Sequence, residues 1–129
     1  MTSTQESLIA ELLDAAKAAG ADGADAILVR GEGTSVDLRF GKVEASERSE
    51  DFDAGLRIFV GRRNASISTG QLDSENIKAL AERAVAMAKI APEDPYARLA
   101  RPEELATSIP ELEMYDDNVP SVDALTDMA

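Results

Sequence analysis

An alternation of apolar and polar side chains through residues 34–69 constrains the fold more than any other feature of the sequence. Val36, Leu38 and Phe40 are each separated by one polar residue, which is the period-two pattern of a half-buried β-strand. The dipeptide Gly41-Lys42 follows directly. It predicts a two-residue type II′ turn, because the first position of that turn needs a positive φ. The segment is therefore expected to begin with a β-hairpin.

This turn also fixes the register expected for the first hairpin. Arg39 falls opposite Glu44 on the polar face, where opposite charges stabilise a strand pair. On the other face the register pairs Phe40 with Val43, Leu38 with Ala45, and Val36 with Glu47.

A second hairpin is predicted around a loop at residues 61–64. Its strands place three pairs on one face, which are Leu56 with Thr69, Ile58 with Ile67, and Val60 with Ala65. Each hairpin then has one apolar face, and other parts of the chain must cover it. The helices predicted on either side are the obvious covers.

Amphipathic helices are predicted before and after the hairpins. Residues 4–19 carry apolar side chains at helical spacing, and Gly20 is suited to end that helix. Residues 73–91 show the same spacing, with Asp73 as the N-cap and Pro92 beyond the end. Three alanines of the second helix would allow it to approach the sheet closely: Ala81, Ala84 and Ala88.

These elements predict an α+β fold, with a mainly antiparallel sheet of about five strands and two helices on one face, in the order α-β-β-β-β-β-α. A strand at residues 25–30 is expected to end at the glycine-rich stretch 31–33, and a bend is expected within 46–53. The α+β domain would occupy residues 1–91. Residues 92–129 would form a proline-rich acidic connector and the start of a truncated helix that leads to an absent C-terminal domain.

The charge and the missing residue types exclude several classes of function. Of the 129 residues, 25 are acidic and 13 are basic, for a net charge of −12, and neither cysteine nor histidine occurs. Thiol chemistry and the usual nitrogen and sulfur ligands of zinc are therefore missing. Residues 92–129 hold ten acids and two bases, a net charge of −8. Binding to nucleic acid or to an anionic membrane is disfavoured, since both are themselves negatively charged. The lack of cysteine fits a cytoplasmic protein.

Paired carboxylates are the first candidates for chemistry in such a chain. Glu50 and Asp51 with Asp53, or Asp116 with Asp117, have the residue types for acid–base work or for binding a hard cation. Neighbouring acids on an exposed segment are more often simply solvated, and the spacing of a calcium loop is absent. We therefore expect no catalytic and no metal-binding residue in this segment, and its substrate-binding residues stay unknown.

Other polar and aromatic residues of the second hairpin give equally weak signals. Ser66, Ser68 and Thr69 lie on a predicted strand, with no histidine in the chain to activate a hydroxyl. Arg62-Arg63 could receive a carboxylate or could be a solvated turn. Phe59 falls on the polar face of its strand, where either another domain or the connector could cover it.

Four segments resemble the N-terminal domain of the TldD/PmbA (TldE) metallopeptidase family, on its PmbA-like side. They are the hairpin GxSVxxRxGxVE at 33–44, the strand GLRxFVG at 55–61, the connector AxxDPYAxLAxPEEL at 91–105, and PELEMYDD at 110–117. The likeness extends over nearly the whole chain. None of the four is a catalytic motif.

The resemblance implies a function that the residues alone do not. Members of the family act as a cytoplasmic heterodimer of a TldD-like and a PmbA-like subunit, which degrades peptides and unfolded segments. Peptide antibiotic maturation, antitoxin degradation and modulation of DNA gyrase are associated with the pair. The zinc-binding HExxxH motif belongs to the TldD-like partner, so no cofactor is expected in this segment, and no family metal ligand can be placed on a chain without histidine.

The leading hypothesis is a non-catalytic N-terminal domain that packs against its own C-terminal domain and helps to enclose the path of a peptide to the zinc of the partner. A sheet edge could pair with the peptide backbone. Two alternatives stay open, a free-standing module whose acidic tail binds a basic protein and a small hydrolase that uses paired carboxylates.

Overall fold

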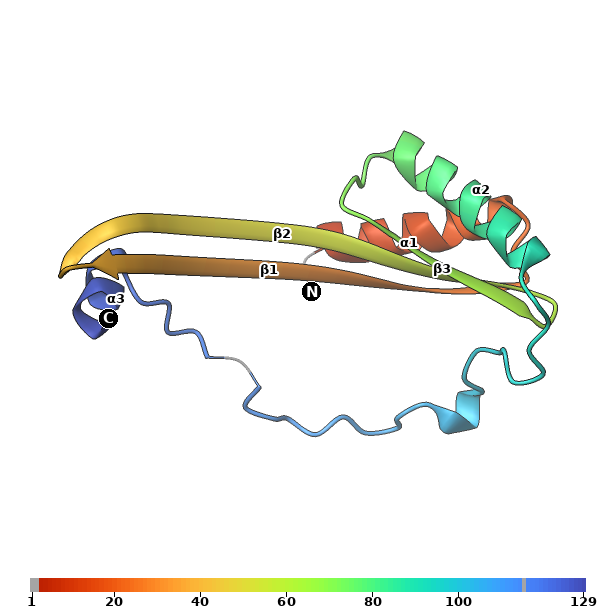
Figure 1. Ribbon diagram of the computed structural model, residues 1–129. Coiled ribbons are helices and arrows are strands. Elements are labelled where there is room, and N and C mark those ends of the chain that lie inside the picture. The colour runs from red at the N-terminus through yellow and green to blue at the C-terminus, as the bar shows by residue number, and fades with distance from the viewer. Residues whose placement is uncertain (1–2, 115) are drawn as a thin grey trace.

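The structure is a computed structural model that describes residues 3–114 and 116–129. In these two stretches the elements follow in the order α1 (Ser3–Ala18), β1 (Gly23–Arg39), β2 (Lys42–Val60), β3 (Arg63–Thr69), α2 (Ser74–Ile90), η1 (Pro102–Glu104, a short 3-10 turn) and α3 (Val122–Met128). The two long helices lie over one end of a narrow antiparallel sheet, whose other end is drawn out into a two-stranded arm (Figure 1).

The prediction of about five strands is wrong, because the described residues form a sheet of three strands in the order β1-β2-β3. The glycine-rich stretch 31–33 and the polar stretch 46–53 do not interrupt their strands. Both stay in the ladder, with Gly31 opposite Asp51 and Gly33 opposite Ser49. A glycine breaks a strand only where the backbone leaves the extended region, and neither of these glycines has a positive φ.

Charged side chains stabilise the arm, which is here defined as residues 30–53, the part of the sheet that has only two strands among the described residues. Glu32 lies opposite Glu50, a like-charge pair that destabilises a ladder on its own. Arg30 forms an ion pair with Glu32, and Arg48 lies 3.0 Å from Glu50 and 3.7 Å from Glu32. Two guanidinium groups thus offset two carboxylates where no apolar core exists.

The turn at the end of the arm differs from the predicted one. Phe40 and Gly41, with φ of 50° and 73°, occupy the two turn positions, and both have the positive φ of a type I′ turn. Arg39 therefore lies opposite Lys42, and a bulge follows at which Glu44 has no partner in the ladder. The predicted register is wrong by one residue over most of the arm. The Arg39–Glu44 ion pair forms nonetheless, at 3.1 Å.

The second hairpin is also tighter than predicted. Leu56 lies opposite Ile67 and Ile58 lies opposite Ala65, so the turn has two residues instead of four. Gly61 allows this turn with a φ of 59°, and its N–H donates to Oδ2 of Asp22 at 2.7 Å. The register shifts by two residues, and an even shift leaves every side chain on its predicted face.

Local signals fix the ends of both long helices. Gly20, with φ 100°, follows α1, and the bonds from its N–H to the carbonyl of Lys17 and from the N–H of Ala21 to that of Ala16 form a Schellman motif. Asp73 caps α2, as predicted, by accepting a hydrogen bond of 3.0 Å from the N–H of Asn76.

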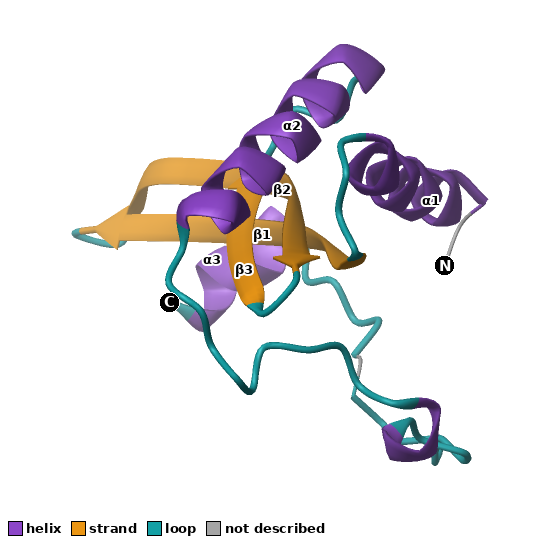
Figure 2. Ribbon diagram, turned by 90° about the vertical axis from the view of Figure 1, so that its right-hand side faces the viewer, coloured by secondary structure: helices purple, strands orange, loops and turns teal. Residues whose placement is uncertain are grey.

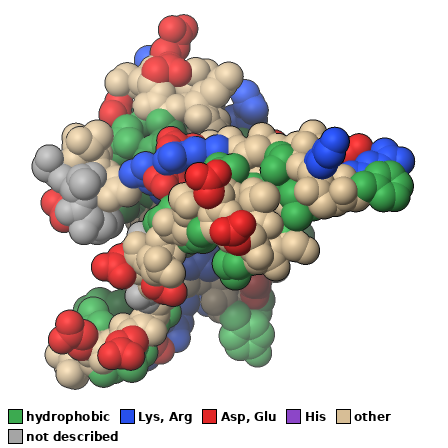
Figure 3. All heavy atoms as spheres, turned by 90° about the vertical axis from the view of Figure 1, so that its left-hand side faces the viewer, with side chains coloured by type: hydrophobic (Ala, Val, Ile, Leu, Met, Phe, Trp, Pro, Cys, Tyr) green, Lys and Arg blue, Asp and Glu red, His purple; other side chains and the backbone are tan. Residues whose placement is uncertain are grey.

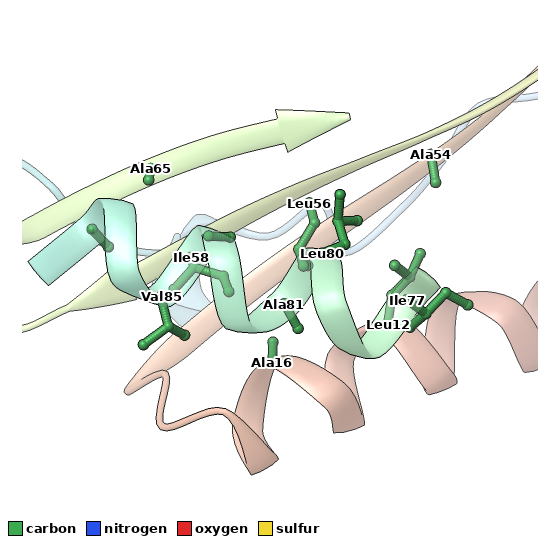
Figure 4. Packing of buried hydrophobic residues seen from close by; sticks show 12 residues of the cluster. Leu12, Ala16, Ala54, Leu56, Ile58, Ala65, Ile77, Leu80, Ala81 and Val85 are labelled. Atoms are coloured by element: carbon green, nitrogen blue, oxygen red, sulfur yellow. The ribbon is translucent and has the colours of Figure 1, made fainter. Parts of the chain in front are cut away.

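Both helices cover the same face of the sheet, where they bury the core (Figure 2). The inward side chains come from all three strands, because β2 contributes Leu56 and Ile58 and its two neighbours contribute further apolar residues. In Figure 4, Ala81 of α2 points toward Ala16 of α1, and both are fully buried. The small side chains let the two helices approach each other. The fully buried members with large side chains are Leu12, Leu56, Ile58 and Ile77.

Residues 91–114 and 116–121 lie between the end of α2 and α3, and α3 lies against β1 of the arm (Figure 1). The chain near Asp94 is fixed to the second hairpin, because its N–H donates to the carbonyl of Arg62 at 2.8 Å. Ser121 caps α3 by accepting from the N–H of Ala124 at 3.1 Å. None of the helices within the described ranges is long and apolar enough to span a bilayer.

Candidate interaction surface

The face of the sheet opposite the helices carries a mixed apolar and polar surface, which we call the open face. Its side chains lie in rows across the three strands, because residues paired in a ladder share a face. One row joins Asp25, Arg57 and Ser66, and the next joins Ile27, Gly55 and Ser68. Ile27 is 62% exposed, although a β-branched apolar side chain in a strand is usually packed against another layer.

An ion pair lies at the centre of the open face. Nε of Arg57 donates to both carboxylate oxygens of Asp25, at 3.0 and 3.1 Å, and its Nη2 also bonds Oδ2. The hydrogen bond to Asp25 raises the pKa of Arg57 above its ordinary value, so the guanidinium stays protonated. The guanidinium of Arg57 also lies 5.2 Å from the ring centre of Phe59. The charges on this row therefore offset each other.

A shallow groove of about 590 Å³ crosses the open face between these rows. Gly55 forms its floor. A Cβ at this position would lie 2.9 Å from Cγ2 of Ile27, which is closer than carbon atoms pack. The absence of a side chain on Gly55 therefore both admits Ile27 and opens the groove. The sequence carried a signal for this, because a glycine inside a strand often marks a close approach.

The connector covers one end of the open face. Leu99 lies against Gly23, where an added Cβ would be 3.1 Å from Cδ1 of Leu99 and 3.9 Å from Cβ of Phe59. Phe59, which lies opposite Gly23 in the ladder, is only 6% exposed. Another domain or the connector could have covered Phe59, and in the structure the connector lies at this end of the face. Ile27 and Val29, further along β1, stay 62% and 53% exposed.

The candidate carboxylates do not come together. Glu50 is engaged by Arg48, and alternation along the strand places Asp51 and Asp53 on the opposite face. Asp116 and Asp117 are exposed in the extended segment before α3. Over residues 3–114 and 116–129 no three acidic side chains are grouped closely enough to hold a metal ion. That this segment lacks catalytic and metal-binding residues stays a prediction.

Of the other candidates in the second hairpin, Thr69 and Arg63 have structural partners. The hydroxyl of Thr69 accepts a hydrogen bond of 3.0 Å from the N–H of Gln71. Arg63 donates to the carbonyl of Lys89 at 2.7 Å and to Glu93 at 3.4 Å, so it fixes the start of the connector. Ser66 and Ser68 are exposed on the open face, where they line the groove.

A carboxylate clamp orders the connector beyond Leu99 and gives a testable pH dependence. Two hydrogen bonds from Arg98, at 2.6 and 2.8 Å, and one from the N–H of Arg101 lower the pKa of Glu104 from 4.5 to about 2. Because the pKa is depressed in the folded chain, the clamp is complete above about pH 4.5 and is lost as the pH falls toward 2. The carboxyl ¹³C resonance of Glu104 should therefore titrate near pH 2, and Arg98→Gln should raise its midpoint. A midpoint near 4.5 in the unsubstituted chain would contradict the clamp.

Sequence comparison places this domain among known proteins. Residues 24–88 match the family model for PmbA/TldA metallopeptidase domain 1. The chain is 31% identical over 117 residues to a metalloprotease PmbA homologue of Haemophilus influenzae, covering 91% of this chain and 26% of that protein. It is 30% identical over 108 residues to metalloprotease PmbA of Escherichia coli O157:H7, with 84% and 24% covered. The chain thus spans about a quarter of the length of these relatives.

Solved structures show the same fold. A crystal structure from Bacteroides thetaiotaomicron, described as that of a candidate modulator of DNA gyrase, superposes with a TM-score of 0.80 at 23% identity. It covers 90% of this chain and 26% of that one. TldE from Thermococcus kodakarensis superposes with a TM-score of 0.61 at 15% identity, covering 88% and 23%.

Proposed function

Because the chain belongs to the PmbA/TldD metallopeptidase family, whose first domain it matches, we propose that it is the non-catalytic first domain of a PmbA/TldE-like subunit. In this proposal it acts by docking. A TldD-type subunit supplies the zinc and the hydrolysis, and this domain helps to assemble the pair in the cytoplasm. The curated relatives are about four times as long, so a C-terminal domain of the same subunit is also part of the proposal.

The open face is the single observation that supports docking best. Interfaces between proteins favour aliphatic and aromatic side chains with arginine at their centre and few unpaired charges. Ile27 and Val29 supply the apolar part, and the bond between Asp25 and Arg57 offsets the central charges. A groove without a grouped set of reactive side chains is suited to contact more than to chemistry.

The substrates in this proposal are peptides and unfolded protein segments, which the assembled pair degrades. Maturation of a peptide antibiotic and degradation of an antitoxin are reactions of this type, and effects on DNA gyrase would follow indirectly from such proteolysis. No residue of this domain contacts the scissile bond. Its contribution is to position the subunits, so loss of docking should abolish activity without a change at the zinc.

Ile27→Glu should weaken binding of the chain to the TldD-type subunit of the same genome by at least about tenfold, because it places an unpaired charge in an apolar contact. The fold should survive, since the side chain is 62% exposed. Biolayer interferometry measures the affinity and thermal melting checks the fold. The matched control is Ile90→Glu, at an 86% exposed position on the outer side of α2, which should bind normally.

Absence of any complex between the unsubstituted chain and the TldD-type subunit would contradict the proposed function. Zinc-dependent peptide cleavage by the chain alone would also contradict it, because the proposal assigns the metal to the partner. Equal binding by Ile27→Glu and the unsubstituted chain would remove the open face from the interface.

A further inference from the structure

The end of the arm, which we call the tip and define as residues 39–43, carries an aromatic side chain in an unfavourable place. Phe40 is 95% exposed, so it stabilises nothing by burial. Its φ of 50° lies in the left-handed region, which a bulky residue rarely adopts because of steric strain. Asparagine before glycine is the favoured pair for a type I′ turn. Folding alone would therefore select against phenylalanine at this position.

The rest of the tip indicates what Phe40 would contact. Arg39 lies 5.7 Å from the ring centre, and Lys42 lies opposite Arg39 in the ladder, so the turn that carries the aromatic ring also carries two cations at its base. Arg39 is offset by Glu44, whereas Lys42 forms no ion pair within the described part of the chain. Val43, which is 49% exposed, adds further apolar surface to the tip. Hydrophobic and basic side chains gather at the end of the projecting arm (Figure 3).

The arm carries the tip far from the helix-covered core. The last ladder pair with β3 is Ala54 with Thr69, so β2 runs from Lys42 to Asp53 with β1 as its sole strand neighbour in the described residues. At about 3.3 Å per residue, these 12 residues span roughly 40 Å. A two-stranded ribbon is marginally stable in water, and a partner at its end would help to order it.

We propose that the tip is an anchor that inserts Phe40 into an apolar socket rimmed by carboxylates on the TldD-type subunit. The charge argument selects a protein surface, because a chain of net charge −12 is repelled by phosphate-rich nucleic acid and by anionic membranes. Lys42 then gains the anionic partner that it lacks in this chain. This inference rests on the proposed function, and it adds a second contact that lies beyond the open face.

Phe40→Asn separates anchoring from folding, because it removes the ring and creates the Asn-Gly pair that the turn favours. Its binding to the TldD-type subunit of the same genome, measured by biolayer interferometry, should weaken at least about tenfold. Its melting temperature should be equal to or higher than that of the unsubstituted chain. Phe40→Tyr should bind as tightly as the unsubstituted chain, because it keeps an aromatic ring. Lys42→Glu should slow the association and make its rate less dependent on the salt concentration. The matched control is Tyr96→Asn, at an 87% exposed aromatic position in the connector, which should bind normally.

Unchanged binding by Phe40→Asn would overturn the anchor while leaving the proposed function intact. Failure of the unsubstituted chain to bind would overturn both. Two other occupants have their own tests. Self-association that depends on Phe40 in sedimentation velocity would assign the tip to a second copy of this chain. Phe40-dependent binding to vesicles of phosphatidylcholine and phosphatidylserine would assign it to a membrane. Either result would overturn the socket on the partner subunit.

Discussion

Leu56→Ala should lower the free energy of unfolding by about 2–5 kcal/mol, the cost of removing a fully enclosed leucine and leaving a cavity. Leu56 is 1% exposed and lies on the central strand β2, on the face of the sheet that the helices cover. The core residues around Leu56 belong to both helices and to the strands, so they cannot move in to fill the cavity that the substitution leaves. Since small domains are stable by only about 5–15 kcal/mol, this one substitution removes much of the total. Urea denaturation followed by circular dichroism gives the value.

The control for Leu56 lies one row away on the other side of the same sheet. Ile27→Ala removes a similar amount of apolar surface from the open face, and it should cost less than about 1 kcal/mol because the side chain is already largely in water. Equal losses for the two substitutions would mean that the sheet is covered on both faces, contrary to the arrangement of the helices in Figure 2.

Ala81→Leu should destabilise the domain by about 1–3 kcal/mol, because it forces three more carbon atoms into a fully buried contact between the two helices. Ala81 is fully buried and points toward Ala16, which is fully buried as well. The added side chain must either push the helices apart or adopt a strained rotamer. Thermal and urea unfolding both report the change.

Ala86→Leu is the matched control, since Ala86 lies on the exposed side of the same helix. Alanine and leucine have similar helix propensities, so this substitution should change stability by less than about 0.5 kcal/mol. A loss at residue 86 as large as that at residue 81 would contradict the assigned helix face.

Short-range patterns in the sequence identified the covered parts of the fold. Helical spacing, Gly20 and Asp73 located both long helices, and period-two alternation located the strand residues. These signals are local, because a cap or a stripe depends on neighbours within a few positions. The inward faces of the second hairpin were also correct, since its error in register was an even number of residues.

The lengths of the strands and the type of the first turn could not be predicted from such local signals. A glycine-rich stretch such as residues 31–33 reads as a break, yet pairing with residues 49–51 keeps it extended, and that pairing joins positions far apart in the sequence. Gly41-Lys42 suited a type II′ turn. Phe40-Gly41 forms the turn instead, at the cost of a positive φ on a bulky residue. The conformational preferences of phenylalanine do not favour the first position of this turn.

The groove on the open face was missed for a related reason. Gly55, Ile27 and Ser68 come from three different strands, and only the register brings them into one row. The sequence could mark Gly55 as unusual within a strand, but it could not show which side chain it faces. The Asp25–Arg57 pair, separated by 32 positions, depends on the same register.

Docking through the open face is tested most directly by methyl NMR of the isoleucine-labelled chain during titration with the TldD-type subunit. The resonance of Ile27 should shift or broaden as the complex forms, whereas that of Ile90, on the outer side of α2, should stay unchanged. A complex that perturbs Ile90 and leaves Ile27 as in the free chain would contradict the use of this face.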